Sequence, residues 1–427
     1  MSGITSDQVT NKHPSLVDDT IFHENDLDDE AKHQFSFHSE ILKAFEINRR
    51  SLLGNDKMTP VGRHILFSMF NSMHTTCKRM LNYAAVNNQL LHFGLPEKGP
   101  LIICGLPRTG STLLYNLLSC DPNCRAPLVT DMMGECIPPI PRSNVAEHQQ
   151  RALTVQFLGK SRNQLVNRSN NMAAAHPSFP IEEDTLIFFQ AGLSSSFMLT
   201  NSYDPCELNT WIYDETNKDY AYDYHKVYLH LLNAVDMPHS HWLLKWSRHL
   251  LYLDTVFEHY PNAAIILTHR NLVETIPSWC QFMWTLVSAF YEETDLTSKI
   301  RATTQAIRYI DKLIECLMIL RTKPAYIERQ SKKAILDVLY DDIMEQPIAA
   351  VRHIYDYFGF SWSPEFEAAM QSWLRENPQG KQGRHTYSLA EFGLTQDEIE
   401  TRYADYIKTF LRSPSRTDLS LDALDTQ

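Results

Sequence analysis

The sequence predicts an α/β fold in which a parallel sheet is covered by helices. Three observations lead to this prediction. Short apolar runs of strand length are each followed by an amphipathic stretch, which is typical of alternating strands and helices. A turn with two glycines separated by four residues follows the first run, and polar residues stand at the end of each run. Because ligands bind beyond the carboxyl ends of parallel strands, we expect these polar residues to share one crevice.

Four segments carry the strand-then-helix pattern. The first is Leu-Ile-Ile-Cys at 101–104, which comes before a glycine turn and a helix over 112–118. The other three are a strand at 242–245 with a helix over 249–259, a strand at 264–268 with a helix from about 272, and a strand at 334–340 with a helix over 347–358.

The pattern changes on both sides of this region. Residues 1–33 are polar and acidic, and we expect a flexible arm there. Residues 34–96 form a helical extension, since Thr59 and Pro60 make a helix start and apolar residues follow at helical spacing. The α/β domain spans 97–375 with an aromatic-rich acceptor insert at about 130–235, and residues 376–427 form a closing loop, a helix and a polar tail.

Composition excludes several classes of protein. The 427 residues, 43% of them hydrophobic, are enough for a large core. Eight cysteines without a C-x-x-C pair indicate neither a zinc nor a disulfide framework, so we expect no metal and a reducing compartment. A formal charge of −12 argues against nucleic-acid binding. Without a membrane-length apolar run or a signal-peptide pattern, we expect a cytoplasmic protein that is not inserted in a membrane and could form a homodimer.

The segment from Gly105 to Thr112 has the G-x-x-x-x-G spacing of a phosphate-binding loop, and it lies between a predicted strand and a predicted helix. Glycines let backbone N–H groups turn toward an anion, and the helix N-terminus adds partial positive charge. Arg108 supplies a cation within the loop, and Ser111 and Thr112 supply hydroxyls. The sheet is therefore expected to be P-loop NTPase-like, with helical N-terminal and C-terminal additions. The alternative is a tight turn without a ligand.

Two departures argue against a nucleotide kinase of the same fold. Ser111 stands where the phosphate-binding lysine would follow the second glycine. The strand at 264–268 ends in His269 and Arg270, where a kinase would offer an aspartate to magnesium.

The segment Pro107-Arg-Thr-Gly-Ser-Thr112 resembles the R-[ST]-G-[ST]-[ST] loop with which sulfotransferases wrap the 5′-phosphosulfate of 3′-phosphoadenosine 5′-phosphosulfate (PAPS). A second element, Arg270 followed eight residues later by Ser278, is similar to the pair that holds the 3′-phosphate in that family. The resemblance covers about residues 97–410. It is closest to bacterial and marine small-molecule and lipid sulfotransferases, with tyrosylprotein sulfotransferases as more distant relatives.

This resemblance implies PAPS as donor and adenosine 3′,5′-bisphosphate as product, without a metal. Tyr340 is similar to a tyrosine that contacts the nucleotide, and Lys381 and Arg384 lie in a Gly-rich basic loop suited to closing over a phosphate. The nucleotide-binding residues expected are Arg108, Thr109, Gly110, Ser111, Thr112, Arg270, Ser278, Tyr340, Lys381 and Arg384.

Sulfuryl transfer to an alcohol needs positive charge on the moving group and a base for the hydroxyl proton. Lys245 matches a lysine that stabilises the leaving phosphate in relatives, although the proline expected between it and His249 is missing. For the base, Asp131 is the first choice because it stands where relatives carry a glutamate. The alternatives are Glu135, His176 and Glu183.

Aromatic residues are dense between positions 187 and 228 and again between 279 and 291. An apolar pocket would suit a small hydroxylated acceptor such as a steroid or lipid alcohol, whereas a helical cap with its own core explains the same residues. The resulting hypothesis is a PAPS-dependent sulfotransferase that works by one in-line displacement. Two alternatives stay open: a nucleotide kinase, or a catalytically inactive nucleotide-binding protein.

Overall fold

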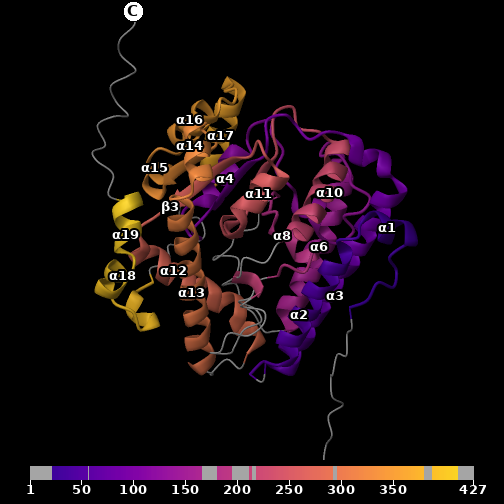
Figure 1. Cartoon of the computed structure of the whole chain (residues 1–427), viewed down its shortest axis with the longest axis horizontal. Helices are drawn as coiled ribbons and strands as arrows, with labels where there is room; N and C mark the ends of the chain where they lie inside the picture. Colours follow the sequence, from indigo (N-terminus) through magenta and orange to yellow (C-terminus); the bar gives the residue numbers. More distant parts are fainter. Residues whose placement is uncertain are drawn as a thin grey trace, which may run out of the picture.

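The computed structural model describes residues 22–55, 57–165, 180–194, 211–213, 218–291, 296–378 and 387–411. Its centre is a parallel four-stranded sheet of order β2-β1-β3-β4. The strands are β1 (Leu101–Gly105), β2 (Leu243–Lys245), β3 (Ala264–His269) and β4 (Ile335–Leu339). All four match segments predicted as strands, and the α/β prediction is confirmed (Figure 1).

Alternate residues of each strand enter two separate hydrophobic clusters. Ile102 and Ile265 belong to the larger cluster, whereas Ile103 and Ile266 belong to the smaller one. The two clusters lie on opposite faces of the sheet because successive side chains of a strand point in opposite directions. Every residue of β1 and β3 is buried, which explains why these strands read as continuous apolar runs.

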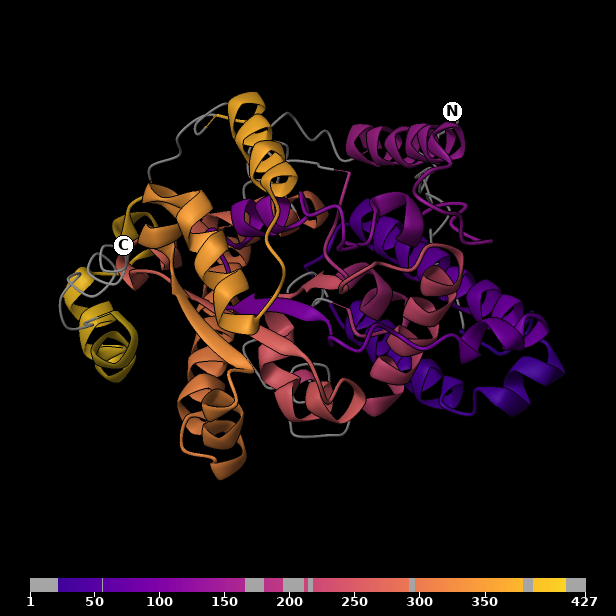
Figure 2. The ribbon, with the colours of Figure 1, turned by 90° about the horizontal axis from the view of Figure 1, so that it is seen from above.

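The smaller cluster is formed with α4 (Ser111–Leu118), α16 (Pro347–Phe358) and α17 (Pro364–Glu376). The larger cluster is formed mainly with α10 (Asp219–Val235), α12 (Leu272–Val287) and α13 (Leu296–Leu320). Figure 2 shows the strands between helices of these two layers. The helix predicted over 249–259 begins as a 3-10 turn, η3 (Ser247–Tyr252), and continues as α11 (Leu253–His259).

The helices of the N-terminal extension, α2 (His38–Leu53) and α3 (Pro60–Val86), share the larger cluster. The Thr59 side chain accepts a hydrogen bond from the Gly62 N–H and caps α3, as its position before Pro60 predicts. The expected flexible arm overlaps α1 (Asp29–Gln34), where Ala31 is fully buried in contact with α3. The last part of that arm is therefore packed structure, and residues 1–21 lie outside the described residues.

The C-terminal helices α18 (Gln396–Arg402) and α19 (Ala404–Tyr406) lie on the opposite side of the molecule from α1, α2 and α3 (Figure 1). Tyr406 is one of their contacts with the rest of the fold, since its hydroxyl lies 3.1 Å from Nδ1 of His269 at the end of β3. The C-terminal segment is thus held next to the carboxyl end of the sheet.

Four more helices in the described ranges lie between or after the strands. The short ones are α5 (Val129–Met132), α8 (Thr185–Gln190) and α15 (Tyr340–Glu345), and the long one is α6 (Val145–Leu165). α14 (Pro324–Ser331) comes before β4.

Candidate functional site

The loop after β1 has a backbone that requires its glycines. Gly105 and Gly110 have φ angles of +117° and +77°, which side-chain-bearing residues rarely adopt. A Cβ at Gly105 would also lie 2.8 Å from the backbone nitrogen of Thr268. Thr109 is buried, and its hydroxyl lies 2.7 Å from the Leu106 carbonyl oxygen and 2.6 Å from the Thr268 hydroxyl. The loop is therefore fixed from within the fold.

Arg108 has a φ of +65°, an uncommon conformation for a residue with a side chain. Its Nε donates a hydrogen bond to the Ser278 hydroxyl at 3.1 Å, and its guanidinium carbon lies 5.4 Å from the centre of the Phe282 ring. Burial lowers the pKa of the Arg108 guanidinium, the nearby Tyr387 raises it, and the positive charge of Arg270 lowers it further. The conformation of Arg108 thus directs its cation toward α12.

Arg270 joins the same cluster from the end of β3. It donates a hydrogen bond from Nη1 to the Arg108 carbonyl at 3.0 Å, and its guanidinium carbon lies 4.0 Å from the centre of the Tyr340 ring. Its Nη2 forms an ion pair with Glu274 at 2.6 Å. The structure thus brings together four residues singled out from the sequence, namely Arg108, Arg270, Ser278 and Tyr340.

A cavity of about 480 Å³ lies against this cluster. Its walls include Arg270 and Tyr340 from the ends of β3 and β4, and Asp405 and Lys408 from the C-terminal segment. Ser111 and Thr112 are half-buried in the first turn of α4, next to Gly110. The carboxyl edge of the sheet therefore carries two guanidinium groups and several hydroxyls, which are donors that fit a phosphorylated ligand. The cavity lies beside them, and its walls also carry the carboxylates of Asp341 and Glu400.

Lys245 ends β2, next to β1 in the sheet. Its backbone pairs with Ile103, two residues before the loop begins at Gly105. The Lys245 side chain is 7% exposed, and its Nζ donates a hydrogen bond to Oε1 of Glu183. The Tyr115 ring lies beside the ammonium, with its centre 5.9 Å from Nζ. A cation and a carboxylate thus meet at the edge of the sheet that carries the loop.

The other sequence-predicted bases lie elsewhere. Asp131 is buried, and its Oδ2 accepts a hydrogen bond from the Leu128 N–H at 2.9 Å and lies 3.6 Å from Nη2 of Arg125. This carboxylate closes the first turn of α5 and balances a buried cation. Glu135 forms an ion pair with Arg79 at 2.8 Å, and that hydrogen bond and charge lower the pKa of its carboxyl. His176, Lys381 and Arg384 lie outside the described residues.

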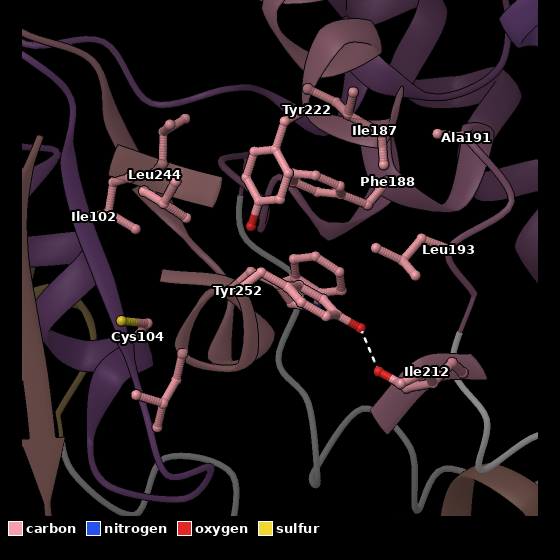
Figure 3. Packing of buried hydrophobic residues seen from close by; sticks show 14 of the residues in the cluster. Ile102, Cys104, Ile187, Phe188, Ala191, Leu193, Ile212, Tyr222, Leu244 and Tyr252 are labelled. Atoms are coloured by element: carbon pink, nitrogen blue, oxygen red, sulfur yellow. Dashed lines mark hydrogen bonds between the residues drawn. The ribbon is translucent and has the colours of Figure 1, made fainter. Parts of the chain in front are cut away.

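Most described aromatic residues of the proposed acceptor insert form core. Phe188, Tyr222, Tyr224 and Tyr228 are fully buried in the larger cluster, and Figure 3 shows Phe188 and Tyr222 packed with apolar residues of neighbouring elements. The Tyr252 hydroxyl in the same view donates to the Ile212 carbonyl at 2.7 Å. These residues are therefore part of the core that the helices share with the sheet.

Sequence reasoning missed a buried polar network behind Lys245. Asp184, the N-terminal flanking residue of α8, contacts the Lys245 backbone, His249 and His225. The sequence offered one signal, the acidic run from Glu182 to Asp184, but nothing in the run distinguishes the buried carboxylate from its neighbours.

Among the described residues, no group of three or more His, Cys, Asp or Glu side chains could hold a metal ion. In the same part of the chain, no helix has the length and apolar character needed to cross a membrane.

Comparisons with known proteins identify the family and the fold. The sulfotransferase family model matches residues 100–364. The crystal structure of sulfotransferase STF9 from Mycobacterium avium is similar, with a TM-score of 0.73 at 22% identity over 92% of this chain and 98% of that one. Sulfotransferase STF1 from Mycobacterium tuberculosis H37Rv has a TM-score of 0.61 at 20% identity over 89% and 94% of the two chains. No curated protein matches the chain.

Proposed function

Because the chain belongs to the sulfotransferase family, we propose that this enzyme transfers the sulfuryl group of PAPS to a hydroxyl of a small, predominantly apolar molecule. The observation that carries the proposal is the meeting of Arg108, Arg270 and Ser278 beside the loop after β1, with Lys245 and Glu183 at the end of the neighbouring strand. One part of the site offers donors to phosphates, and the other offers a cation and a base.

The residues around the loop fit a nucleotide with two phosphorylated positions. Arg108 and the first turn of α4 would hold the 5′-phosphosulfate, and Arg270 with Ser278 would hold the 3′-phosphate. Planar guanidinium groups suit phosphate oxygens because they donate two parallel hydrogen bonds. Tyr340 packs on the Arg270 guanidinium and orients it. The bound nucleotide would supply the sulfuryl group.

We propose Glu183 as the base that accepts the proton of the acceptor hydroxyl. Of the described candidates, Glu183 contacts Lys245, whereas Asp131 closes a turn beside Arg125 and Glu135 pairs with Arg79. The Lys245 ammonium would stabilise negative charge on the leaving phosphate oxygen while the new bond to sulfur forms. The proton then rests on the carboxylate, and no covalent intermediate with the protein is needed.

The acceptor is proposed to approach along α12. Phe282 and Trp284 on that helix are only partly buried, and the Phe282 ring lies beside Arg108. Apolar side chains next to the cation favour an acceptor with a hydrocarbon body and one hydroxyl. A steroid or a lipid alcohol has this chemistry.

A nucleotide kinase is less well supported. His269 ends β3, where a kinase would offer an aspartate to magnesium. Its imidazole is buried and lies 2.8 Å from Asp337 and 3.1 Å from Tyr406, so it contacts protein groups instead. An inactive nucleotide-binding protein would keep the loop without the need for a Lys245–Glu183 pair.

We also propose a cytoplasmic location, because the seven cysteines within the described ranges are free thiols.

The first experiment compares thermal stabilisation by adenosine 3′,5′-bisphosphate with that by AMP and by ATP plus magnesium. At 100 times its dissociation constant, a ligand adds about 2.7 kcal/mol to the free energy of unfolding. Selective stabilisation by the bisphosphate supports the proposal, and Arg270→Ala should abolish it. Turnover of PAPS with cholesterol or 1-dodecanol then tests the acceptor class. Stabilisation by ATP and magnesium alone would favour the kinase.

A further inference from the structure

The network behind Lys245 centres on one carboxylate. Asp184 is fully buried. Its Oδ1 accepts a hydrogen bond from the Lys245 backbone N–H at 3.1 Å, and its Oδ2 lies 3.0 Å from Nε2 of His249 and 3.1 Å from Nε2 of His225. Three groups from two separate segments of the chain therefore converge on a single side chain.

A second layer fixes the two histidines. Nδ1 of His249 lies 2.8 Å from the Tyr222 hydroxyl, and Nδ1 of His225 lies 2.7 Å from the Tyr260 hydroxyl. Each tyrosine can donate to Nδ1, which leaves the proton of each imidazole on Nε2; that of His249 donates to the carboxylate, and that of His225 lies close to it. The Phe188 ring stacks on His225 at 4.8 Å between ring centres. The imidazoles are thus held in position by groups on both sides.

The carboxylate at the centre stays ionised. Burial alone would raise the pKa of Asp184, but the charge and hydrogen bonds of His249 and His225 lower it below its ordinary value. Burial lowers the pKa of His225, although its contact with Asp184 opposes this shift. A buried charge of this kind is costly, and apolar residues would pack the same space more favourably. Packing by itself therefore does not account for Asp184.

We infer that Asp184 is a positioning residue for sulfuryl transfer, an inference that rests on the proposed function. Asp184 follows Glu183 directly in sequence and holds the backbone of Lys245. One side chain thus joins the start of α8, which carries the proposed base, to the end of β2, which carries the proposed cation. The carboxylate keeps Glu183 and Lys245 at a fixed separation.

The test is a double-mutant cycle between Asp184→Asn and Glu183→Gln. The readout is single-turnover conversion of PAPS to adenosine 3′,5′-bisphosphate, with 1-dodecanol or water as acceptor. Asp184→Asn should slow conversion by about 10- to 100-fold in the wild-type background. It should slow conversion by no more than about three-fold when Glu183 is already replaced, because the separation between the proposed base and Lys245 then no longer limits the rate.

Asp121→Asn is the matched control. Asp121 is also a buried carboxylate, and it accepts hydrogen bonds from the Tyr355 hydroxyl at 2.8 Å and the Asn123 N–H at 2.9 Å. An asparagine can keep both contacts because its amide N–H can donate to the Tyr355 hydroxyl, whereas at position 184 the amide N–H would face the Nε2–H of His249 and disturb the network. The control should leave conversion within about two-fold of wild type in both backgrounds.

Two readouts do not depend on activity. The affinity for adenosine 3′,5′-bisphosphate, measured by calorimetry, should stay within about two-fold in Asp184→Asn, because the Arg108 and Arg270 cluster is separate. Amide exchange should rise in peptides covering residues 243–249 and stay unchanged in those covering 335–339. If Asp184→Asn does not fold, His249→Gln disturbs the contact of His249 with Oδ2 of the same carboxylate and enters the same cycle.

The outcomes separate two failures. Equal loss of rate from Asp184→Asn in both backgrounds, with active wild-type enzyme, would overturn the positioning role and leave the proposed function intact. Wild-type protein that neither binds the bisphosphate nor converts PAPS would overturn the proposed function and this inference with it. Bisphosphate binding without conversion would identify an inactive nucleotide-binding protein and remove the positioning role.

Discussion

Replacement of Gly110 by alanine should weaken nucleotide binding through the side chain of Tyr340. Gly110 has a φ of +77°, and a Cβ there would lie 3.1 Å and 3.4 Å from two carbons of the Tyr340 ring. The ring would have to move by a few tenths of an ångström. Because the Arg270 guanidinium packs on that ring at 4.0 Å, the movement reaches the residue proposed to hold the 3′-phosphate.

The expected effect has two parts. The positive φ costs an alanine about 1–2 kcal/mol of folding free energy. Displacement of Arg270 weakens charge-assisted hydrogen bonds that are each worth about 1.5–3 kcal/mol. A loss of about half of one such bond raises the dissociation constant of adenosine 3′,5′-bisphosphate by roughly three- to ten-fold.

Gly359→Ala separates these parts. Gly359 has a φ of +68°, but a Cβ there would meet nothing within 4 Å. Both variants should therefore melt a few degrees lower than wild type, measured by calorimetry, and only Gly110→Ala should lose affinity for the bisphosphate in titration calorimetry. Equal affinity in the two variants would refute the role given to the loop and to Tyr340.

Three further predictions follow from the same structure. Lys245→Met should lower PAPS turnover by about 10²- to 10³-fold, with a much smaller change in bisphosphate affinity; a rate near wild type would remove the cation from the reaction. Burial lowers the pKa of His38 to about 4 and of His74 to about 3, so stability is complete above the unfolded pKa of about 6.5 and falls as the pH drops toward 4, by about 2 kcal/mol per histidine at pH 5. Urea unfolding should show this loss in wild type, and a His38→Gln/His74→Gln variant should show a flatter profile; parallel profiles would contradict it. Asp131→Asn should lower the free energy of unfolding by at most about 3–5 kcal/mol, because it removes one of the two carboxylates beside the buried Arg125 and leaves Asp236, while bisphosphate affinity stays close to wild type; turnover lost without a loss of stability would restore Asp131 as the base.

The sheet and its loop could be predicted because the relevant signals are local. Residues 101–104 and 264–268 are buried on both faces, so each reads as an uninterrupted apolar run. The loop needs glycines at two positive φ angles, and those glycines stand in the sequence at the expected spacing. The cap of α3 at Thr59 is equally local, since it depends on residues at most three positions apart.

The carboxylates could not be sorted in the same way. Asp131 and Glu183 both lie in polar segments between predicted elements, and what distinguishes them is a tertiary partner, Arg125 for one and Lys245 for the other. Glu183 and Lys245 are 62 positions apart in sequence and meet because α8 begins beside the end of β2. The aromatic residues raise the same difficulty, because a buried tyrosine such as Tyr222 looks in sequence like one that lines a pocket.

The cations of the site indicate how an acidic protein could bind the acidic nucleotide proposed as its donor. Arg270 pairs with Glu274, Lys245 pairs with Glu183, and Arg108 donates to Ser278, so each positive group has a partner within the chain. The side chain of Glu274 is 57% exposed, and an exposed ion pair contributes at most about 1 kcal/mol. A phosphate can therefore replace that partner at low cost, whereas the largely buried Lys245 would exchange its partner only for a group that reaches the end of β2. Selectivity among anions then follows from the depth at which each cation is buried. The overall charge of −12 repels anions that contact only the exposed Arg270–Glu274 pair.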